Sequence, residues 1–179
     1  MKTFRLILIL AVLSAAPVAR LPASEPPLDS HFEIFRPFLE KTWKGQFKNS
    51  TPDKPVVDVA RWERALNGRA IRVLHSVNDG IYGGETIFTW DAAKQCLVYH
   101  YFTTDGDRTT GTLISKDGKF VTSEVVTGDA DGVTEVRATT DFLPDGGYHV
   151  KAEYLKKGEW TPGHELTYKE DASAKVVFK

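Results

Sequence analysis

The sequence has only one cysteine, Cys96. An internal disulfide is therefore excluded, and a folded chain of this length must gain its stability from core packing. Cys96 opens an apolar segment, 96–98, and a thiol in such a setting is typical of a buried structural residue rather than a reactive one. No cysteine stands directly after the amino-terminal apolar run, which excludes the usual lipid attachment of a bacterial lipoprotein.

The amino-terminal apolar run is too short to cross a bilayer. It comprises eight strongly apolar residues, 6–13, after the basic residues Lys2 and Arg5, whereas a spanning helix needs about 20. A basic start, a short apolar run and then small residues are typical of a secretory signal peptide rather than a membrane anchor. We expect cleavage after Ala23, with Ala19 as the alternative, and export to the periplasm or the extracellular space.

An excess of positive charge is also lacking. The formal net charge is −1, and removal of residues 1–23 changes it to −4, because that segment carries Lys2, Arg5 and Arg20 and no acid. A mildly acidic domain without a basic patch is poorly suited to nucleic acid or to anionic lipid. We predict a signal peptide at 1–23, a proline-rich tether at 24–29 and a single domain at 30–179, with no nucleic-acid partner and no stable membrane insertion of the mature chain.

The sequence lacks a recognisable hydrolytic or metal-binding motif. Ser76, Ser115 and Ser123 lie within strand patterns and not on a Gly-x-Ser-x-Gly elbow. Four histidines lie on or near predicted strands, and no pair of them has the short spacing of a zinc site. These histidines are His75, His100, His149 and His164. We therefore predict a protein that is not an enzyme and has no dedicated metal site.

Turn signals, in contrast, are abundant. Seven pairs of a polar residue and a glycine punctuate the chain, and each supplies the positive φ that a tight hairpin needs. The pairs are Asn67-Gly68, Asp79-Gly80, Asp105-Gly106, Asp117-Gly118, Asp131-Gly132, Asp145-Gly146 and Lys157-Gly158. Strand patterns fill the intervals at 42–48, 56–66, 69–78, 81–90, 96–103, 108–115, 119–127, 133–142, 147–156 and 160–169.

This rhythm predicts an all-β fold: an antiparallel up-and-down β-barrel of about ten strands with a short amino-terminal helix. Closing the sheet on itself is the simplest way to remove its two edges. A β-sandwich is the alternative, but it usually needs longer Greek-key crossovers than these loops provide. The helix is expected at about 30–40, capped by Asp29 or Ser30 and shortened or broken by Pro37.

Two short segments allow more than one interpretation. The glycines Gly83 and Gly84 interrupt a strand pattern, which predicts a bulge or a sharp bend. In the segment 61–64, an inward arginine beside Trp62 could hold a ligand carboxylate, whereas an outward Arg61 or Arg64 would join a solvated ion-pair ladder. The second interpretation is the one we expect.

Strand alternation assigns side chains to the barrel interior, because neighbouring residues point to opposite faces. Many inward tyrosines favour a cavity for an amphipathic molecule, since each buried phenol needs a polar partner. The predicted ligand-binding residues are His75, Tyr82, Phe88, Tyr99, Tyr101, Tyr148, Tyr154 and His164. If the interior is solid instead, these residues are packing, and the protein is a structural or interaction module with a filled barrel.

The order of these elements resembles a known group of folds. An apolar run at 35–39, then Lys41-Thr42-Trp43-Lys44-Gly45, then a ten-strand meander is similar to the lipocalin-like (calycin) barrels, above all exported bacterial members, and more distantly to the nitrobindin-type haem barrels. In these families a tryptophan on the first strand closes one end of the barrel in a Gly-x-Trp context. Here Lys41 stands at the first glycine position, which departs from that pattern.

Because the aromatic residues share the inward face, we predict a small hydrophobic or amphipathic ligand inside the barrel, bound without catalysis. The nitrobindin-type resemblance implies an alternative: haem held by a histidine of the last strand, where His164 stands. An axial ligand must project into an apolar pocket, and His164 shares its predicted inward face with Leu166 and Tyr168. An inward histidine is also commonly a hydrogen-bonded core residue, so both interpretations remain open at this point.

Overall fold

The computed structural model describes residues 26–128 and 131–179, so the predicted signal peptide at 1–23 lies outside the described residues. A short 3-10 helix, η1 (Ser30–Phe35), precedes ten strands. The strands are β1 (Lys41–Phe47), β2 (Val57–Ala65), β3 (Ala70–Val77), β4 (Tyr82–Asp91), β5 (Cys96–Thr103), β6 (Arg108–Lys116), β7 (Lys119–Thr127), β8 (Val133–Phe142), β9 (Tyr148–Lys156) and β10 (Glu159–Glu170). Single 3-10 turns, η2 (Leu66–Gly68) and η3 (Asn78–Gly80), follow β2 and β3.

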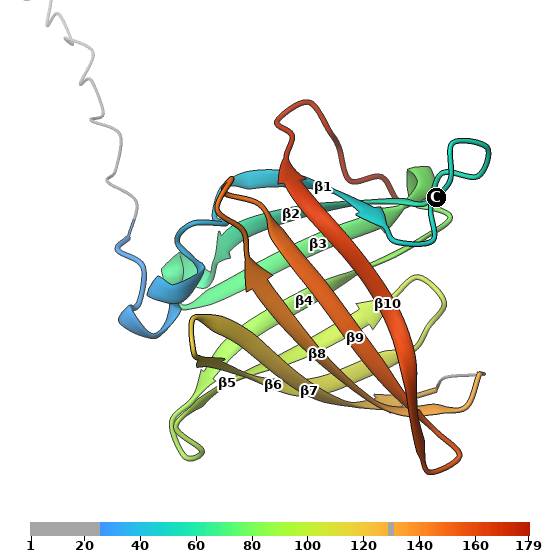
Figure 1. Cartoon of the computed structure of the whole chain (residues 1–179). Coiled ribbons are helices and arrows are strands. Elements are labelled where there is room, and N and C mark those ends of the chain that lie inside the picture. The colour runs from blue at the N-terminus through green and yellow to red at the C-terminus, as the bar shows by residue number, and fades with distance from the viewer. Residues whose placement is uncertain (1–25, 129–130) are drawn as a thin grey trace, which may run out of the picture.

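The strands form one closed antiparallel barrel in up-and-down order (Figure 1). Each strand pairs with its neighbours in sequence, and β1 closes the barrel against β10, with Gly45 opposite Tyr168. The predicted fold class is therefore confirmed, and the expected strand ends agree with the observed ones to within one residue. The glycines of all seven predicted turn pairs have positive φ. No helix among the described residues is long and apolar enough to cross a membrane.

The amino-terminal helix is shorter than expected. It is a 3-10 helix that ends at Phe35, and Asp29 caps it by accepting a hydrogen bond from the backbone N–H of His31. Pro37 lacks an N–H and fixes φ, so the helix does not continue through the segment to residue 40. The chain instead turns so that Phe35 and Phe38 enter one end of the barrel, here called the helix end.

Aromatic side chains fill the helix end of the barrel. Phe35 is fully buried and contacts the rings of Trp62, Phe88 and Phe120. Trp43 on β1 is 2% exposed and donates its indole N–H to the carbonyl of Phe38. This cluster, the aromatic plug, consists of Phe32, Phe35, Phe38, Trp43, Trp62, Phe88, Tyr99, Phe120 and Tyr148. It anchors the helix and seals this end against water.

Of the bulge or sharp bend predicted at Gly83 and Gly84, the bulge is absent, because the β3–β4 register runs without a shift from Ile71 to Val77. Register shifts occur instead between β8 and β9, from Val133 to Glu135, and between β9 and β10, from Pro162 to Glu165. Proline cannot donate to a ladder and glycine tolerates unusual backbone angles, so this segment is well suited to a bulge.

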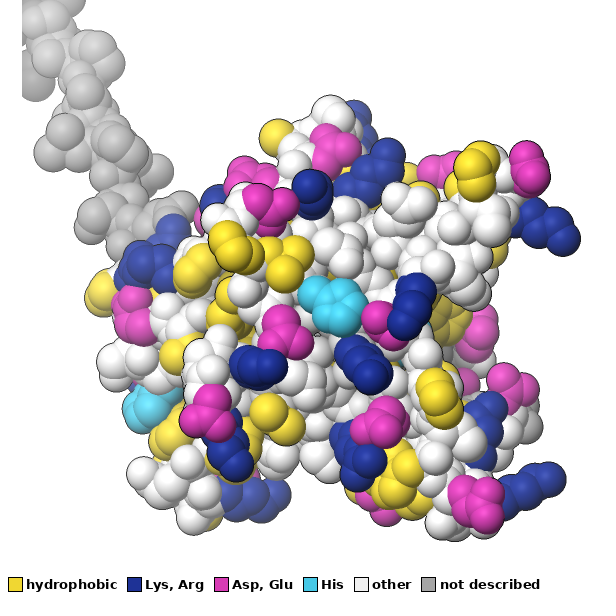
Figure 2. Space-filling model, in the orientation of Figure 1, with side chains coloured by type: hydrophobic (Ala, Val, Ile, Leu, Met, Phe, Trp, Pro, Cys, Tyr) yellow, Lys and Arg dark blue, Asp and Glu magenta, His cyan; other side chains and the backbone are white. Residues whose placement is uncertain are grey.

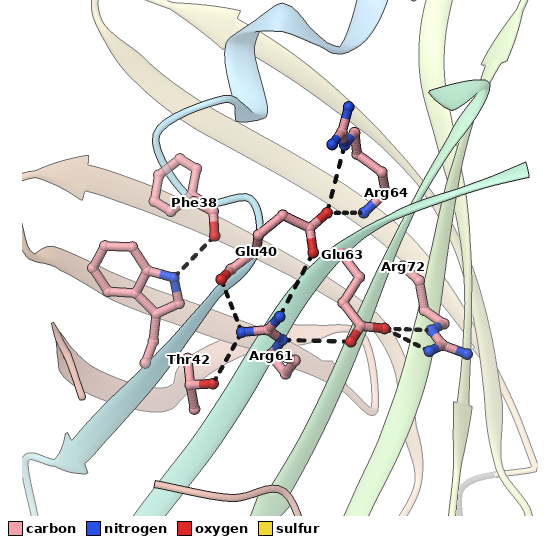
Figure 3. Close-up of polar contacts among 8 residues, drawn as sticks. Phe38, Glu40, Thr42, Arg61, Glu63, Arg64 and Arg72 are labelled. Carbon is pink, nitrogen blue, oxygen red and sulfur yellow. Dashed lines mark hydrogen bonds and ion pairs between the residues drawn. The ribbon is translucent and has the colours of Figure 1, made fainter. Parts of the chain in front are cut away.

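The outer surface carries balanced ion pairs. On β2 and β3, Arg61 and Arg72 both pair with Glu63, and Glu40 contacts Arg61 and Arg64 (Figure 3). The expected outer ladder is thus observed, while Trp62 between the arginines points into the aromatic plug. Positive and negative side chains are likewise interspersed over β8, β9 and β10 (Figure 2). This face offers no single-sign patch.

Candidate functional site

Polar side chains occupy the half of the interior that lies away from η1. This far half includes the start of β2 at Val57 and the end of β3 at Val77, which pair near the end of the barrel opposite the aromatic plug. Its polar groups come from eight strands and face the same interior space. They are Asp58, His75, Tyr82, Tyr101, Thr109, Glu124, Tyr154, His164 and Tyr168.

A continuous hydrogen-bond chain runs along one side of this space. The Nδ1 atom of His75 lies 2.7 Å from Oδ1 of Asp58, and its Nε2 atom lies 2.7 Å from the hydroxyl of Tyr101. The Tyr101 hydroxyl lies 2.9 Å from that of Tyr82. Tyr168 donates to the other carboxylate oxygen of Asp58 at 2.7 Å. Both oxygens of a carboxylate that is only 1% exposed are thus partnered.

Two glycines make this chain geometrically feasible. Gly45 on β1 pairs with Tyr168 on one side and with Asp58 on the other, and a Cβ there would lie 2.6 Å from the Tyr168 ring. The ring therefore passes over a strand that has no side chain at this point and reaches Asp58 two strands away. Gly84 on β4 plays the same part for Tyr101, which crosses it to reach His75.

The bulge in β10 places His164. Pro162 pairs with Glu153 and Glu165 with Lys151, so Gly163 and His164 stand together opposite Ala152. The backbone N–H of His164, free of the ladder, donates to the Tyr154 hydroxyl at 3.3 Å, and the ring Nδ1 lies 2.7 Å from the same hydroxyl. Burial lowers the pKa of His164, although the nearby Asp58 carboxylate opposes this. The ring is therefore held as a neutral imidazole.

Glu124 on β7 is a carboxyl group on the opposite wall. Burial raises its pKa, and hydrogen bonds from Thr109 and Tyr99 oppose that shift. Burial also raises the pKa of Tyr101, with Tyr82, Asp58 and Glu124 adding to the effect. The phenol groups of the far half therefore keep their protons over the whole physiological range of pH.

The predicted site residues divide into two groups. His75, Tyr82, Tyr101, Tyr154 and His164 meet in the far half, as one polar cluster. The other three predicted residues, Phe88, Tyr99 and Tyr148, are at most 7% exposed and belong to the aromatic core.

Four participants were missed by sequence reasoning. They make hydrogen bonds in the far half and are Asp58, Thr109, Glu124 and Tyr168. Tyr168 had been assigned to the correct face, whereas the strand of Asp58 has apolar residues on both faces, with Val57 and Val59 alternating against Ala60 and Trp62.

Solvent reaches the far half. The His75 side chain is 21% exposed although it points into the barrel, and Tyr82, Tyr101, Tyr154 and His164 are also only partly buried. The aromatic plug behaves differently, since Trp43, Phe35 and Phe38 are at most 3% exposed. The interior is thus packed at the helix end and accessible to water at the other.

A hollow on the outer wall is a competing location for a ligand. It has a volume of about 380 Å³ and lies over β5, β6 and β7, where Val98, His100, Thr110 and Val125 line it. Val125 is 59% exposed. His100 therefore lies outside the barrel on β5, whereas His164 lies inside it on β10.

The described residues contain no group of three or more histidine, cysteine or acidic side chains arranged to hold a metal ion. His164 is nevertheless suited to bind iron through a single bond. Its Nδ1 is anchored by Tyr154, and no hydrogen bond engages its Nε2 among the described residues. Such anchoring by a hydrogen bond at the other ring nitrogen is common among metal-bound histidines.

Comparisons with known proteins identify the fold. No protein-family model matches the sequence, and no curated protein matches it. Among solved structures, the chain is similar to Rv2717c from M. tuberculosis, with a TM-score of 0.59 and 10% sequence identity over 81% of this chain and 99% of that one. At this identity the likeness concerns the fold alone, which in this chain is a closed ten-strand antiparallel barrel.

Proposed function

We propose that this protein is an exported, non-catalytic binding protein that holds a small, largely apolar or amphipathic molecule in the far half of the barrel. One observation carries the proposal: inward side chains there remain accessible to solvent, with His75 21% exposed, whereas the aromatic plug is sealed. A barrel of this size can be filled by side chains or can enclose a ligand. Here the helix end is filled by aromatic side chains, and inward side chains of the far half are partly exposed.

The chemistry of the walls agrees with this proposal. Ligand pockets are mostly apolar and contain a few convergent polar groups that orient the ligand. Val136 and Leu166 are buried apolar residues outside the core cluster of the aromatic plug. Among the described residues, the hydroxyl of Tyr82 and the imidazole of His164 each have a hydrogen-bonding position that no described partner uses. The ligand's polar group would contact these two residues, and its apolar part Val136 and Leu166.

Two further expectations support the proposal without being part of the described structure. The amino-terminal sequence is typical of a secretory signal peptide, which would place the binding protein in the periplasm or outside the cell. The resemblance to lipocalin-like barrels implies a ligand in the interior. The proposal therefore treats this chain as a carrier or sensor and not as an enzyme.

Uptake of a defined ligand tests this function. Native mass spectrometry of the purified protein with 1-decanol should show a one-to-one adduct, and the His164→Ala variant should bind it roughly three- to tenfold more weakly because a polar contact is lost. His100→Ala is the matched control, since this histidine lies on the outer wall. Uptake that only His100→Ala weakens would place the ligand outside. No uptake by the wild-type protein would favour a filled interaction module.

Haem binding is the second candidate, and the anchored imidazole of His164 favours it. A neutral ring with its Nδ1 held by Tyr154 and its Nε2 unengaged fits the requirements of an axial ligand. Haem would supply an iron centre for oxygen or oxidised nitrogen species, while this chain would contribute the ligand and its orientation. Titration with haem should give a Soret band that is lost in His164→Ala and retained in His100→Ala. An unchanged spectrum would eliminate this candidate.

A further inference from the structure

The hydrogen-bond chain from Asp58 to Tyr82 ends at the ligand space, and its direction depends on a proton. Asp58 is 1% exposed, and His75 is the only described base that pairs with it. A carboxylate only accepts hydrogen bonds, and a tyrosine hydroxyl has one proton to donate. These two facts fix the direction of every bond in the chain once the protonation state of His75 is known.

With His75 neutral, its one ring proton lies on Nδ1, because Asp58 needs a donor at 2.7 Å. The Nε2 atom is then an acceptor and takes the proton of Tyr101. Since Tyr101 has no second proton, Tyr82 must donate to it. The oxygen of Tyr82 then presents only lone pairs to the ligand space, and the uncompensated charge of Asp58 adds a negative potential there.

With His75 protonated, each bond beyond Asp58 reverses. The Nε2–H group donates to Tyr101, Tyr101 donates to Tyr82, and the proton of Tyr82 becomes free to point into the ligand space. The charge of the imidazolium also compensates that of Asp58. The same site therefore accepts a hydrogen bond in one state and donates one in the other, with no movement of the backbone.

We propose that this chain is the polar subsite for the ligand, and that protonation of His75 switches its preference from cationic or hydrogen-bond-donating groups to oxyanions and carbonyl oxygens. The inference rests on the proposed function, because it requires a ligand in the far half. Binding of an anionic amphipathic molecule is thereby coupled to uptake of one proton, and an acidic medium favours loading.

The other ionisable groups around His75 do not replace it in this role. Tyr82 and Tyr101 contact its ring from β4 and β5, and their pKa values are raised by burial. His164 faces it from β10, and burial favours the neutral form of that ring. Glu124 on β7 acts on Tyr101 from the opposite wall. His75 alone touches both the buried carboxylate and the tyrosine pair.

Two probes have no titratable group, and they therefore distinguish this switch from titration of the ligand itself. They are 1-decanesulfonate, an anion that only accepts hydrogen bonds, and decyltrimethylammonium, a cation that donates none. Between about pH 8 and about pH 5, the affinity for the sulfonate should rise by up to about tenfold per pH unit, and that for the ammonium ion should fall. Binding is measured by isothermal titration calorimetry below the micellar concentration of each probe.

Variants identify the titrating group. His75→Gln should remove both slopes, and His100→Gln should leave them unchanged. Tyr82→Phe, which preserves the pairing of His75 with Asp58, should weaken sulfonate binding at low pH roughly three- to tenfold and leave ammonium binding unaffected. By reciprocity, saturation with sulfonate should increase the protonated fraction of the His75 ring in nitrogen-detected NMR spectra of the full-length protein.

The outcomes are distinguishable. Opposite slopes that disappear in His75→Gln support the switch. Parallel or flat slopes, or slopes that persist in His75→Gln, overturn it and leave the ligand site standing. Failure of both probes and of 1-decanol to bind at any pH overturns the proposed function itself. Should His75→Gln fail to fold, Tyr82→Phe decides, and equal sulfonate affinity at low pH in this variant and the wild type overturns the proposal.

Discussion

The substitution Tyr168→Phe removes one hydroxyl from the interior and leaves the ring in place. That hydroxyl donates to Oδ2 of Asp58 at 2.7 Å, and the carboxylate is only 1% exposed, so water cannot readily replace the lost donor. A hydrogen bond to a charged group contributes about 1.5–3 kcal/mol. Asp58 retains His75 as its second partner, and we therefore expect the free energy of unfolding to fall by about 2 kcal/mol.

Urea denaturation at neutral pH, followed by tryptophan fluorescence, measures this loss, and the melting temperature should fall by roughly 4–8 °C. Tyr82→Phe is the matched control, because its hydroxyl bonds to the neutral Tyr101 in a partly exposed position. That variant should lose only about 0.5–1 kcal/mol. Equal losses in the two variants, or a loss below about 0.5 kcal/mol for Tyr168→Phe, would show that the buried carboxylate does not depend on this donor.

Three further perturbations follow from the same structure. Gly45→Ala places a Cβ 2.6 Å from the Tyr168 ring and should cost about 1–3 kcal/mol by overpacking; wild-type stability would contradict the crossing of the ring over β1. Because burial raises the pKa of Glu124, this residue stabilises the fold below the unfolded value of 4.5, and that stabilisation is lost as pH rises through the folded value. In urea denaturation, the free energy of unfolding of Glu124→Gln should therefore increase relative to that of the wild type from about pH 4 to about pH 8. A difference that stays constant with pH would refute this. Arg61→Ala should cost at most about 1 kcal/mol, and less in high salt, because the ladder is solvated; a larger loss in thermal denaturation would contradict that description.

Local sequence signals were sufficient to predict the barrel. The polar-glycine pairs set the reversals, and two-residue alternation assigned Ile71, Val73 and His75 to one face. The structure bears out that face, since Val73 is buried in the core and His75 reaches Asp58. Strand ends and inward faces depend on residues that are close together in the sequence, so a single sequence is sufficient to predict them.

The polar chain could not be predicted, because it depends on pairing between strands. Gly45 lets Tyr168 reach Asp58 only because β1 lies between their strands in a particular register. Glu124 was missed since its strand places Val121 and Val125 outside and a carboxyl group inside, against the usual pattern. The bulge that orients His164 lies between Pro162 and Glu165 and was not predicted, although the proline-glycine pair there is a sequence signal for one.

Location of a bound probe tests the ligand site most directly. Isotope-edited NOE spectra of the protein with 1-decanol should show contacts from the probe's methylene protons to the rings of Tyr82, Tyr101 and His164, which line the far half of the interior. Contacts confined to His100 and Val125 would place the probe on the outer wall. That result, or the absence of any contact, would contradict a ligand inside this barrel.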